Sequence, residues 1–266
     1  MPKVLAISSQ VSCGHVGLSA IVPALQALQQ QIIALPTILL SNHPGHAHVS
    51  DSRVEPALLT KMLTALDKNG WLEDVANILT GYCPTVEHVL YAREAITLTK
   101  LRAPNATVIC DPIIGDEAEG IYIDQAAAEA IQRELVPVAD ILLPNTFELG
   151  WLSGISLSST AATVAAARDL PASTTIVTSV PWADNHIANL HVTSETATAA
   201  VCELLEHVPK GTGDFFSAVF AHDRDVGLAT ARTRTLIEHS LGRDHLSIAA
   251  ASQAWLKVAP AETVAV

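Results

Sequence analysis

Short runs of branched apolar residues alternate along the chain with longer stretches rich in alanine and leucine. The short runs predict β-strands and the longer stretches predict helices. The expected strands occupy residues 4–8, 32–40 with a break at Pro36, 75–80, 107–110, 141–143 and 175–178, followed by an antiparallel pair at 187–192 and 198–204. The expected helices occupy residues 19–30, 56–66, 85–101, 124–135, 147–152, 160–170, 213–221, 228–241 and 245–255.

This alternation indicates the class of fold. Strands separated by helices of ten or more residues are typical of parallel βαβ units with right-handed crossovers. We therefore expect an α/β fold, with an open, mostly parallel, doubly wound sheet that carries helices on both faces. One domain should fill residues 1–266, because no repeat and no low-complexity linker divides the chain. Residues 187–204 are expected to form an edge hairpin.

Polar residues follow several of the expected strands at the point where each strand ends. In open α/β sheets, ligands bind outside the carboxyl ends of the strands. We therefore expect a single cleft that collects the polar residues at these ends, which are Ser9, Tyr82, Asp111, Asn145, Thr178 and the segment 210–214.

The segment Pro209–Phe216, with the sequence PKGTGDFF, carries the most specific signal. Gly211 and Gly213 let consecutive backbone N–H groups point into one concavity, and a helix is expected to begin directly afterwards. Lys210 adds a cation, and Asp214 is a carboxylate that can accept a proton from an attacking hydroxyl. The spacing is not that of a P-loop. The alternative is an ordinary helix N-cap made by Thr212 or Asp214.

Composition narrows the range of partners. Lys and Arg number 15 against 27 Asp and Glu, giving a formal charge of −12, which disfavours general binding to nucleic acid or to an anionic membrane. The first apolar run, residues 4–7, is too short for the core of a signal peptide, and no run approaches a membrane span. The four cysteines form no CxxC pair and are expected to be reduced thiols of a cytoplasmic protein.

The motif at 210–216 resembles the signature of the ribokinase superfamily, and other segments are similar to pyridoxal kinases in the same order along the chain. The resemblance covers residues 4–220 and implies a ribokinase-like fold. It is carried by residues 7–11 (ISSQV), 14–20 (GHVGLSA), 40–43 (LSNH), 80–82 (TGY), 110–116 (CDPIIGD), 120–122 (GIY), 144–149 (PNTFEL) and 177–179 (VTS).

The resemblance implies ATP-dependent phosphorylation of the 5′-hydroxymethyl group of pyridoxal, pyridoxine or pyridoxamine by a homodimer. Asp214 would be the general base, and the amides of Gly211, Thr212 and Gly213 would stabilise the transferring phosphoryl group. The vitamin would contact Ser9, Val16, His43, Pro44, Tyr82 and Asp214. The nucleotide would contact Asp111, Asn145, Glu148, Thr178, Ser179, Val208, Lys210, Gly211, Thr212 and Gly213.

The resemblance implies that Mg²⁺ binds with ATP near Asp111 and Glu148. K⁺ is a candidate second cation, and the sequence does not show whether it assists Mg²⁺. Taken alone, Glu148 could instead complete a capping box with Asn145. Two loops are expected to move, a lid near residues 41–52 and a flexible loop near residues 115–123. The lid histidines are spaced too irregularly to favour a zinc site.

Two residues depart from the family pattern. Leu18 stands where many pyridoxal kinases have Asn, and Pro44 stands where many have a Thr that contacts the substrate, so Gly45 or His46 would have to replace that contact. The stretch after residue 220 resembles the family only in being helical. The departures at Leu18 and Pro44 keep open the alternative of a non-catalytic protein that binds vitamin B6. A hydroxymethylpyrimidine kinase of the same superfamily is a second alternative, because it would share Asp214 and the glycine segment but need different contacts to the ring. A sugar kinase is less favoured, because the N-terminal segment has no polar cluster suited to several hydroxyls.

Overall fold

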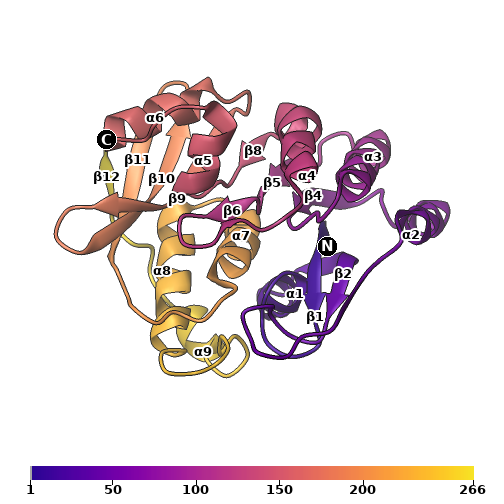
Figure 1. Cartoon of the computed structure of the whole chain (residues 1–266), viewed down its shortest axis with the longest axis horizontal. Helices are drawn as coiled ribbons and strands as arrows, with labels where there is room; N and C mark the ends of the chain where they lie inside the picture. The colour runs from indigo at the N-terminus through magenta and orange to yellow at the C-terminus, as the bar shows by residue number, and fades with distance from the viewer. Residues whose placement is uncertain (1) are drawn as a thin grey trace.

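A computed structural model describes residues 2–266, and one ten-stranded sheet runs through it (Figure 1). Six neighbouring strands are parallel, which confirms the predicted class of sheet. In spatial order they are β2 (Gln31–Leu40), β1 (Lys3–Val11), β4 (Val75–Thr80), β5 (Thr107–Cys110), β8 (Ile141–Leu142) and β9 (Thr174–Trp182). The antiparallel strands are β3 (Asp51–Arg53) beside β2, and then β10 (His186–Thr193), β11 (Ala197–Glu203) and β12 (Thr263–Ala265) beyond β9. A separate hairpin pairs β6 (Gly115–Asp116) with β7 (Gly120–Ile121).

Helices cover both faces of the sheet, as expected (Figure 1). One layer contains α2 (Pro56–Lys68), α3 (Val86–Arg102), α4 (Gln125–Ala130), which continues as a π-helical turn over Ile131–Leu135 and a 3-10 turn over Val136–Val138, α5 (Thr146–Ser153) and α6 (Thr160–Asp169). The other layer contains α1 (Leu18–Ala27), α7 (Thr212–Asp223), α8 (Val226–Glu238) and α9 (Ser252–Trp255). Successive side chains of a strand point to opposite faces of the sheet. Leu5 and Ile7 therefore join the core under the layer of α2 to α6, while Val4 and Ala6 join the core under α1, α7, α8 and α9.

The predicted break into two strands at Pro36 is wrong, because β2 continues through it as one strand, although its register with β1 shifts directly after Pro36. Proline has no N–H to donate and is tolerated in a sheet where no neighbouring strand needs that donor. On the side of β2 away from β1, the pairing with β3 begins only at Ile38. Pro36 therefore occupies a locally unpaired side of the strand.

The end of the chain differs most from the prediction. Strands β10 and β11 form the expected antiparallel pair, but β12 pairs with Thr198–Ala200, so that hairpin is not at the edge of the sheet. The expected helix at 245–255 shrinks to the four residues of α9. Leu246 and Ile248 are buried in the core from a turn segment, and the indole N–H of Trp255 donates to the carbonyl of Ile248 at 2.9 Å. Core burial of a turn thus produced the helix-like apolar spacing.

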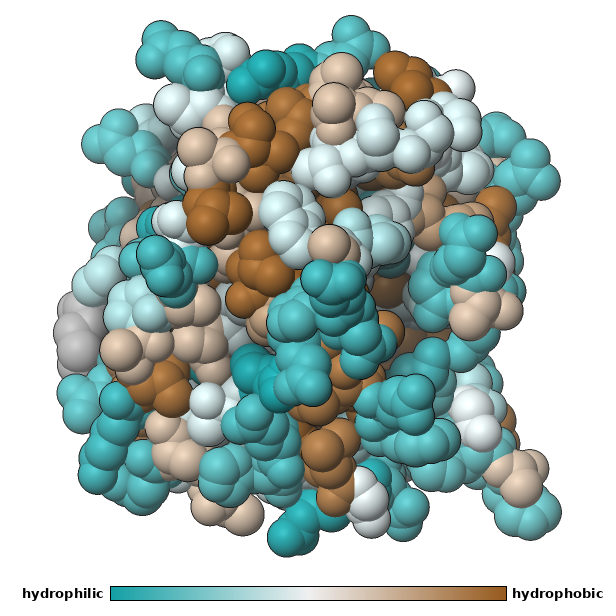
Figure 2. Space-filling view, turned by 90° about the vertical axis from the view of Figure 1, so that its left-hand side faces the viewer, coloured by the Kyte–Doolittle hydropathy of each residue, from teal (hydrophilic) through white to brown (hydrophobic). Residues whose placement is uncertain are grey.

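The surface at the β12 edge mixes apolar and polar residues. Figure 2 turns this side toward the viewer and shows hydrophobic side chains scattered among hydrophilic ones. Val264 and Val266 are among the exposed apolar residues of the chain end, at 44% and 45%.

No helix within residues 2–266 combines the length and the apolar character needed to cross a bilayer. The cysteines Cys13, Cys83, Cys110 and Cys202 are free thiols.

Candidate active site

Every site residue predicted from the sequence lines one cleft of about 1580 Å³. The cleft lies at the carboxyl ends of the parallel strands, where the topology of the sheet places ligands. Pockets for a single small ligand are typically about 300–1,000 Å³, so this cleft has room for two ligands. The predicted residues that line it are Ser9, Val16, His43, Pro44, Tyr82, Asp111, Asn145, Glu148, Thr178, Ser179, Val208, Lys210, Gly211, Thr212, Gly213 and Asp214.

The first turn of α7 presents uncapped backbone donors to this cleft. Gly211 is the N-cap residue in a left-handed conformation (φ 99°), and no side chain caps the helix. The first N–H groups of a helix have no partner within the helix, and the helix dipole makes this end attractive to anions. A cap made by Thr212 or Asp214 is therefore not present, and the segment is free to act as an anion nest.

Gly211 also fixes how α7 meets the N-terminal loop. A Cβ atom at this position would lie 1.8 Å from the backbone oxygen of His15, so no side chain fits. Gly17 is equally restricted, because its Cβ would lie 2.2 Å from the oxygen of Ser9. The approach of Gly211 to His15 brings the predicted phosphate side of the cleft against the N-terminal loop, while the approach of Gly17 to Ser9 packs that loop against the end of β1.

Asp214 has the electrostatic properties of a proton acceptor. Burial raises the pKa of its carboxyl to about 6, while hydrogen bonding to the N–H groups of Gly17 and of Asp214 itself opposes the shift. A general base works best when its pKa lies near the working pH. Asp214 can therefore be ionised at neutral pH and still have a useful affinity for a proton.

Asp111 and Glu148 form a second acidic centre, with exposed fractions of 9% and 3%. Burial raises the pKa of both carboxyls, that of Glu148 to about 7, and the charge of Glu148 raises the pKa of Asp111 further. The Ser217 hydroxyl donates to Asp111 Oδ2 at 2.6 Å. Sequence analysis missed Ser217, although it follows Asp214 by three residues on the same helix and so shares its face. A cation between these carboxylates would relieve their repulsion.

The capping-box alternative for Glu148 is confirmed. The N–H of Glu148 donates to Asn145 Oδ1 at 2.9 Å, and the N–H of Asn145 donates back to Glu148 Oε2 at 2.9 Å. The N–H groups of Ile114 and Gly115 donate to Oε1 at 2.8 and 3.4 Å. A carboxylate has about four acceptor sites, so these three donors orient Glu148 and leave capacity for a further ligand. Capping and a role near a metal are therefore compatible.

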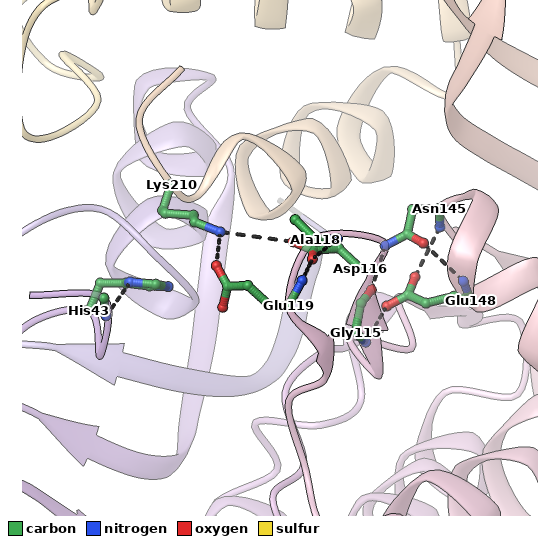
Figure 3. Close-up of polar contacts among 9 residues, drawn as sticks. His43, Gly115, Asp116, Ala118, Glu119, Asn145, Glu148 and Lys210 are labelled. Atoms are coloured by element: carbon green, nitrogen blue, oxygen red, sulfur yellow. Dashed lines mark hydrogen bonds and ion pairs between the residues drawn. The ribbon is translucent and has the colours of Figure 1, made fainter. Parts of the chain in front are cut away.

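The loop expected at 115–123 contains the β6–β7 hairpin, which the sequence did not predict (Figure 3). Asn145 Nδ2 donates to the carbonyl of Gly115 at 2.8 Å, which ties the base of the hairpin to α5. Near its tip, Glu119 accepts a hydrogen bond from Lys210. The hairpin thus spans the cleft from the capping box to the glycine segment.

The predicted vitamin pocket has an apolar wall. Val16 and Tyr82 pack against the buried side chains of Val11, Ile38 and Leu40. The backbone of Tyr82 is fixed on both sides, since its N–H donates to Ser8 Oγ at 3.1 Å and its carbonyl accepts from Thr37 Oγ1 at 2.7 Å. His43 and Pro44 line the same cleft from the loop before β3. Within residues 2–266, no three His, Cys, Asp or Glu side chains are placed to hold a metal ion by themselves.

Two residues that line the cleft, from the segments 110–116 and 177–179, have strained backbones. Ile113 and Ser179 have left-handed backbones, with φ of 41° and 56°, and such strain in non-glycine residues clusters at functional sites. The N–H of Ser179 donates to Asn189 Oδ1 at 3.1 Å, which holds that conformation. The cleft is further lined by Trp151, Ser156, Leu157, Ser158, Ser159, Thr160, Val180 and Pro181.

The raised pKa of Asp214 makes a prediction for the dependence of activity on pH. If this carboxylate accepts the substrate proton, kcat/KM should fall as the pH drops through about 6, because the protonated acid cannot act as a base. A rate profile between pH 5 and 8 at saturating metal measures this limb. A flat profile over that range would contradict the assignment.

The sequence model of the family described as phosphomethylpyrimidine kinase matches residues 70–244. A pyridoxal kinase from Leifsonia xyli subsp. xyli is 32% identical over 242 residues, which cover 88% of this chain and 86% of the relative. A pyridoxine/pyridoxal/pyridoxamine kinase from Bordetella avium is 35% identical over 223 residues, which cover 81% of this chain and 75% of the relative.

Solved structures share the whole fold. The pyridoxal kinase from Leishmania donovani in complex with ADP and pyridoxine superposes with a TM-score of 0.86 at 28% identity and covers 99% of both chains. The pyridoxal kinase from Entamoeba histolytica gives a TM-score of 0.91 at 23% identity and covers both chains completely, a likeness that concerns the fold.

Proposed function

This chain belongs to the pyridoxal kinase family of the ribokinase superfamily, and from that membership and its cleft we propose that it phosphorylates B6 vitamers with ATP. The acceptor is the 5′-hydroxymethyl group of pyridoxal, pyridoxine or pyridoxamine, and the product from pyridoxal is pyridoxal 5′-phosphate. The observation that carries the proposal is the position of Asp214, with its raised pKa, in the uncapped first turn of α7.

The reaction needs one proton transfer and the stabilisation of moving negative charge. The hydroxyl oxygen of the vitamer forms a bond to the γ-phosphorus while the bond from that phosphorus to the bridging oxygen of ADP breaks. The hydroxyl proton passes to the carboxylate of Asp214. The N–H groups of Thr212 and Gly213 donate to the phosphoryl oxygens, where preorganised donors lower the barrier most.

The carboxylates Asp111 and Glu148 fit a hydrated Mg²⁺. They are buried like charges, and Mg²⁺ favours oxygen ligands and keeps several waters, so a complete cage of protein ligands is not required. When bound with ATP, Mg²⁺ supplies charge neutralisation for the phosphates. Asp111 is oriented by Ser217 for this purpose, and Glu148 is oriented by backbone N–H groups.

The proposed substrate pocket combines Ser9 with the walls formed by Val16 and Tyr82, and His43 and Pro44 lie over it from the loop that acts as a lid. On the nucleotide side, the proposed contacts are Lys210, Asn145, Thr178, Ser179 and Val208. Pro44 has no side-chain donor, and the N–H of Gly45, which lines the same cleft, already donates to His43 Nδ1 at 3.0 Å. Gly45 would have to give up this bond to replace the expected hydroxyl. The homodimer and a second cation such as K⁺ stay predictions from the family resemblance, and the cytoplasmic location stays a prediction from the cysteine pattern.

A second candidate is a kinase for hydroxymethylpyrimidine. It is favoured by the description of the matching family model, and it would use Asp214 and the same nest with different contacts to the ring. The B6 reading is preferred, because the relatives that match over more than four fifths of the chain are pyridoxal kinases.

Formation of pyridoxal 5′-phosphate by the purified protein tests the proposal. Product is followed by absorbance and identified by mass spectrometry in mixtures that contain or lack ATP, pyridoxal or Mg²⁺. We expect product only in the complete mixture, and a metal chelator should stop its formation. Saturable binding of pyridoxal without product in any mixture would overturn the kinase and indicate a binding protein.

A further inference from the structure

The cleft is strongly acidic for a site that must accept a nucleotide. Lys210 is the one lysine or arginine that lines it within the part of the chain described, residues 2–266. The carboxylates that line it are Asp111, Asp116, Glu117, Glu119, Glu148 and Asp214. The availability of Lys210 to phosphate therefore bears directly on how well a nucleotide binds.

Lys210 is already occupied by the β6–β7 hairpin. Its Nζ donates to Glu119 Oε1 at 2.5 Å and lies 3.8 Å from Asp116 Oδ2 (Figure 3). Glu119 and Lys210 are 91 residues apart in sequence, so the tertiary fold creates this pair. The side chains of both are about half exposed, at 50% and 49%, and both can rotate to new partners.

The two acidic residues of the hairpin have different roles. Asp116 is built into the turn, because its Oδ1 accepts from the N–H groups of Ala118 and Glu119 at 3.0 and 2.7 Å. The Glu119 carboxylate has Lys210 as its one ion-pair partner among the described residues 2–266. The base of the hairpin is tied to Asn145, so Glu119 holds its tip against the glycine segment.

We propose that Glu119 is a positioning residue that pairs with Lys210 in the ligand-free protein. It competes there with the nucleotide phosphates for the Lys210 ammonium and so lowers the affinity of the protein for nucleotide. A phosphate oxygen takes the place of the Glu119 carboxylate on the Lys210 ammonium, and this exchange releases the tip of the hairpin from the glycine segment. The proposal rests on the proposed function, since it assumes that phosphates reach Lys210.

The size of the effect follows from the exposure of the pair. An exposed ion pair shifts an equilibrium by up to about fivefold. The apparent Kd of the nucleotide equals its intrinsic Kd divided by the fraction of molecules in which Lys210 is free, so freeing Lys210 lowers the apparent Kd. Glu119→Gln should therefore lower the Kd of ADP with Mg²⁺ by about three- to fivefold. The gain should shrink at high salt, which screens exposed charges.

The matched control is Glu117→Gln. Glu117 lies in the same hairpin, lines the same cleft and forms no ion pair among the described residues, so the control removes the same charge without freeing Lys210. We expect it to change the Kd of ADP by less than about 1.5-fold, the general effect of one distant charge.

A double-mutant cycle with Lys210→Met separates competition from simple repulsion. Titration calorimetry with Mg²⁺ and ADP gives the four Kd values. In the Lys210→Met background, Glu119→Gln should change the Kd by less than about 1.5-fold, because no ammonium is left to free. The same gain in both backgrounds would overturn the competition, since it would mean that Glu119 repels phosphate directly. No gain in either background would also overturn it.

The test stands apart from turnover. If the wild-type protein binds ADP but makes no phosphorylated vitamer, the proposed function fails while the four Kd values still decide the role of Glu119. If the wild type phosphorylates pyridoxal and the cycle shows no coupling, only the role of Glu119 fails. Thermal melting of each variant confirms that the exposed substitutions leave the fold intact.

Discussion

Replacing Asp214 by asparagine is expected to lower kcat for pyridoxal phosphorylation by about 10²–10⁴-fold, the usual contribution of a positioned general base. Asparagine keeps the shape of the side chain but cannot accept the hydroxyl proton. Binding of ADP and pyridoxal should persist, because the N–H groups of α7 and the apolar wall near Tyr82 are unchanged. Turnover and both Kd values measure this split. Turnover of Asp214→Ala within about tenfold of wild type would contradict the role of Asp214.

The substitution Asp214→Asn is also expected to stabilise the protein at neutral pH. The pKa of Asp214 is about 6 in the folded chain and near 3.8 when exposed, so ionisation favours the unfolded state. This destabilisation is absent well below pH 4 and complete above pH 6. Because the side chain is partly exposed, Asp214→Asn should add about 1–2 kcal/mol to the free energy of unfolding at pH 7.5. Denaturant titrations at pH 7.5 and pH 4 should show the gain shrink at the lower pH, and a loss of stability at pH 7.5 would contradict the account.

Gly211→Ala is expected to be the most damaging addition of a single methyl group in the cleft. The new Cβ would lie 1.8 Å from the oxygen of His15, a backbone atom that cannot turn aside, and φ of 99° strains any L-residue. The glycine segment must therefore move away from the N-terminal loop. Displacement of about 1 Å at a reacting centre can cost about 10²-fold, so we expect kcat/KM to fall at least that much.

Gly242→Ala is the matched control for this substitution. Gly242 also has positive φ, at 72°, but a Cβ there meets nothing within 4 Å. It should cost only the conformational strain, about 1–2 kcal/mol in the free energy of unfolding, with kcat/KM within about twofold of wild type. If Gly211→Ala also stays within twofold, the close approach to His15 has no part in positioning the phosphate site.

The sequence was most informative where the backbone itself carries the signal. The alternation of strands and helices predicted a parallel sheet, and polar residues after the strands predicted one cleft, because parallel strands end at the same edge. Gly211 was recognisable since its left-handed backbone admits little else. All predicted site residues line the cleft, while their roles in binding and catalysis stay predictions.

The features that were missed depend on contacts between distant segments. Strand β12 has three residues, too few for a periodic pattern, and exists because β11 offers an open edge. The turn segment before α9 imitates a helix because its apolar residues reach the core. The pairing of Lys210 with Glu119 arises only when the hairpin folds over the cleft. No local pattern encodes such contacts.

The most direct test of the central claim compares acceptors in one coupled assay of ADP release. Purified protein with Mg²⁺ and ATP is given pyridoxal, pyridoxine, pyridoxamine or hydroxymethylpyrimidine, with a control that has no acceptor. A B6 vitamer should give a kcat/KM well above that of the pyrimidine, and it would show that Pro44 is tolerated in the pocket. Turnover with the pyrimidine alone, or no turnover with any of the four acceptors, would contradict the claim that this cleft phosphorylates vitamin B6.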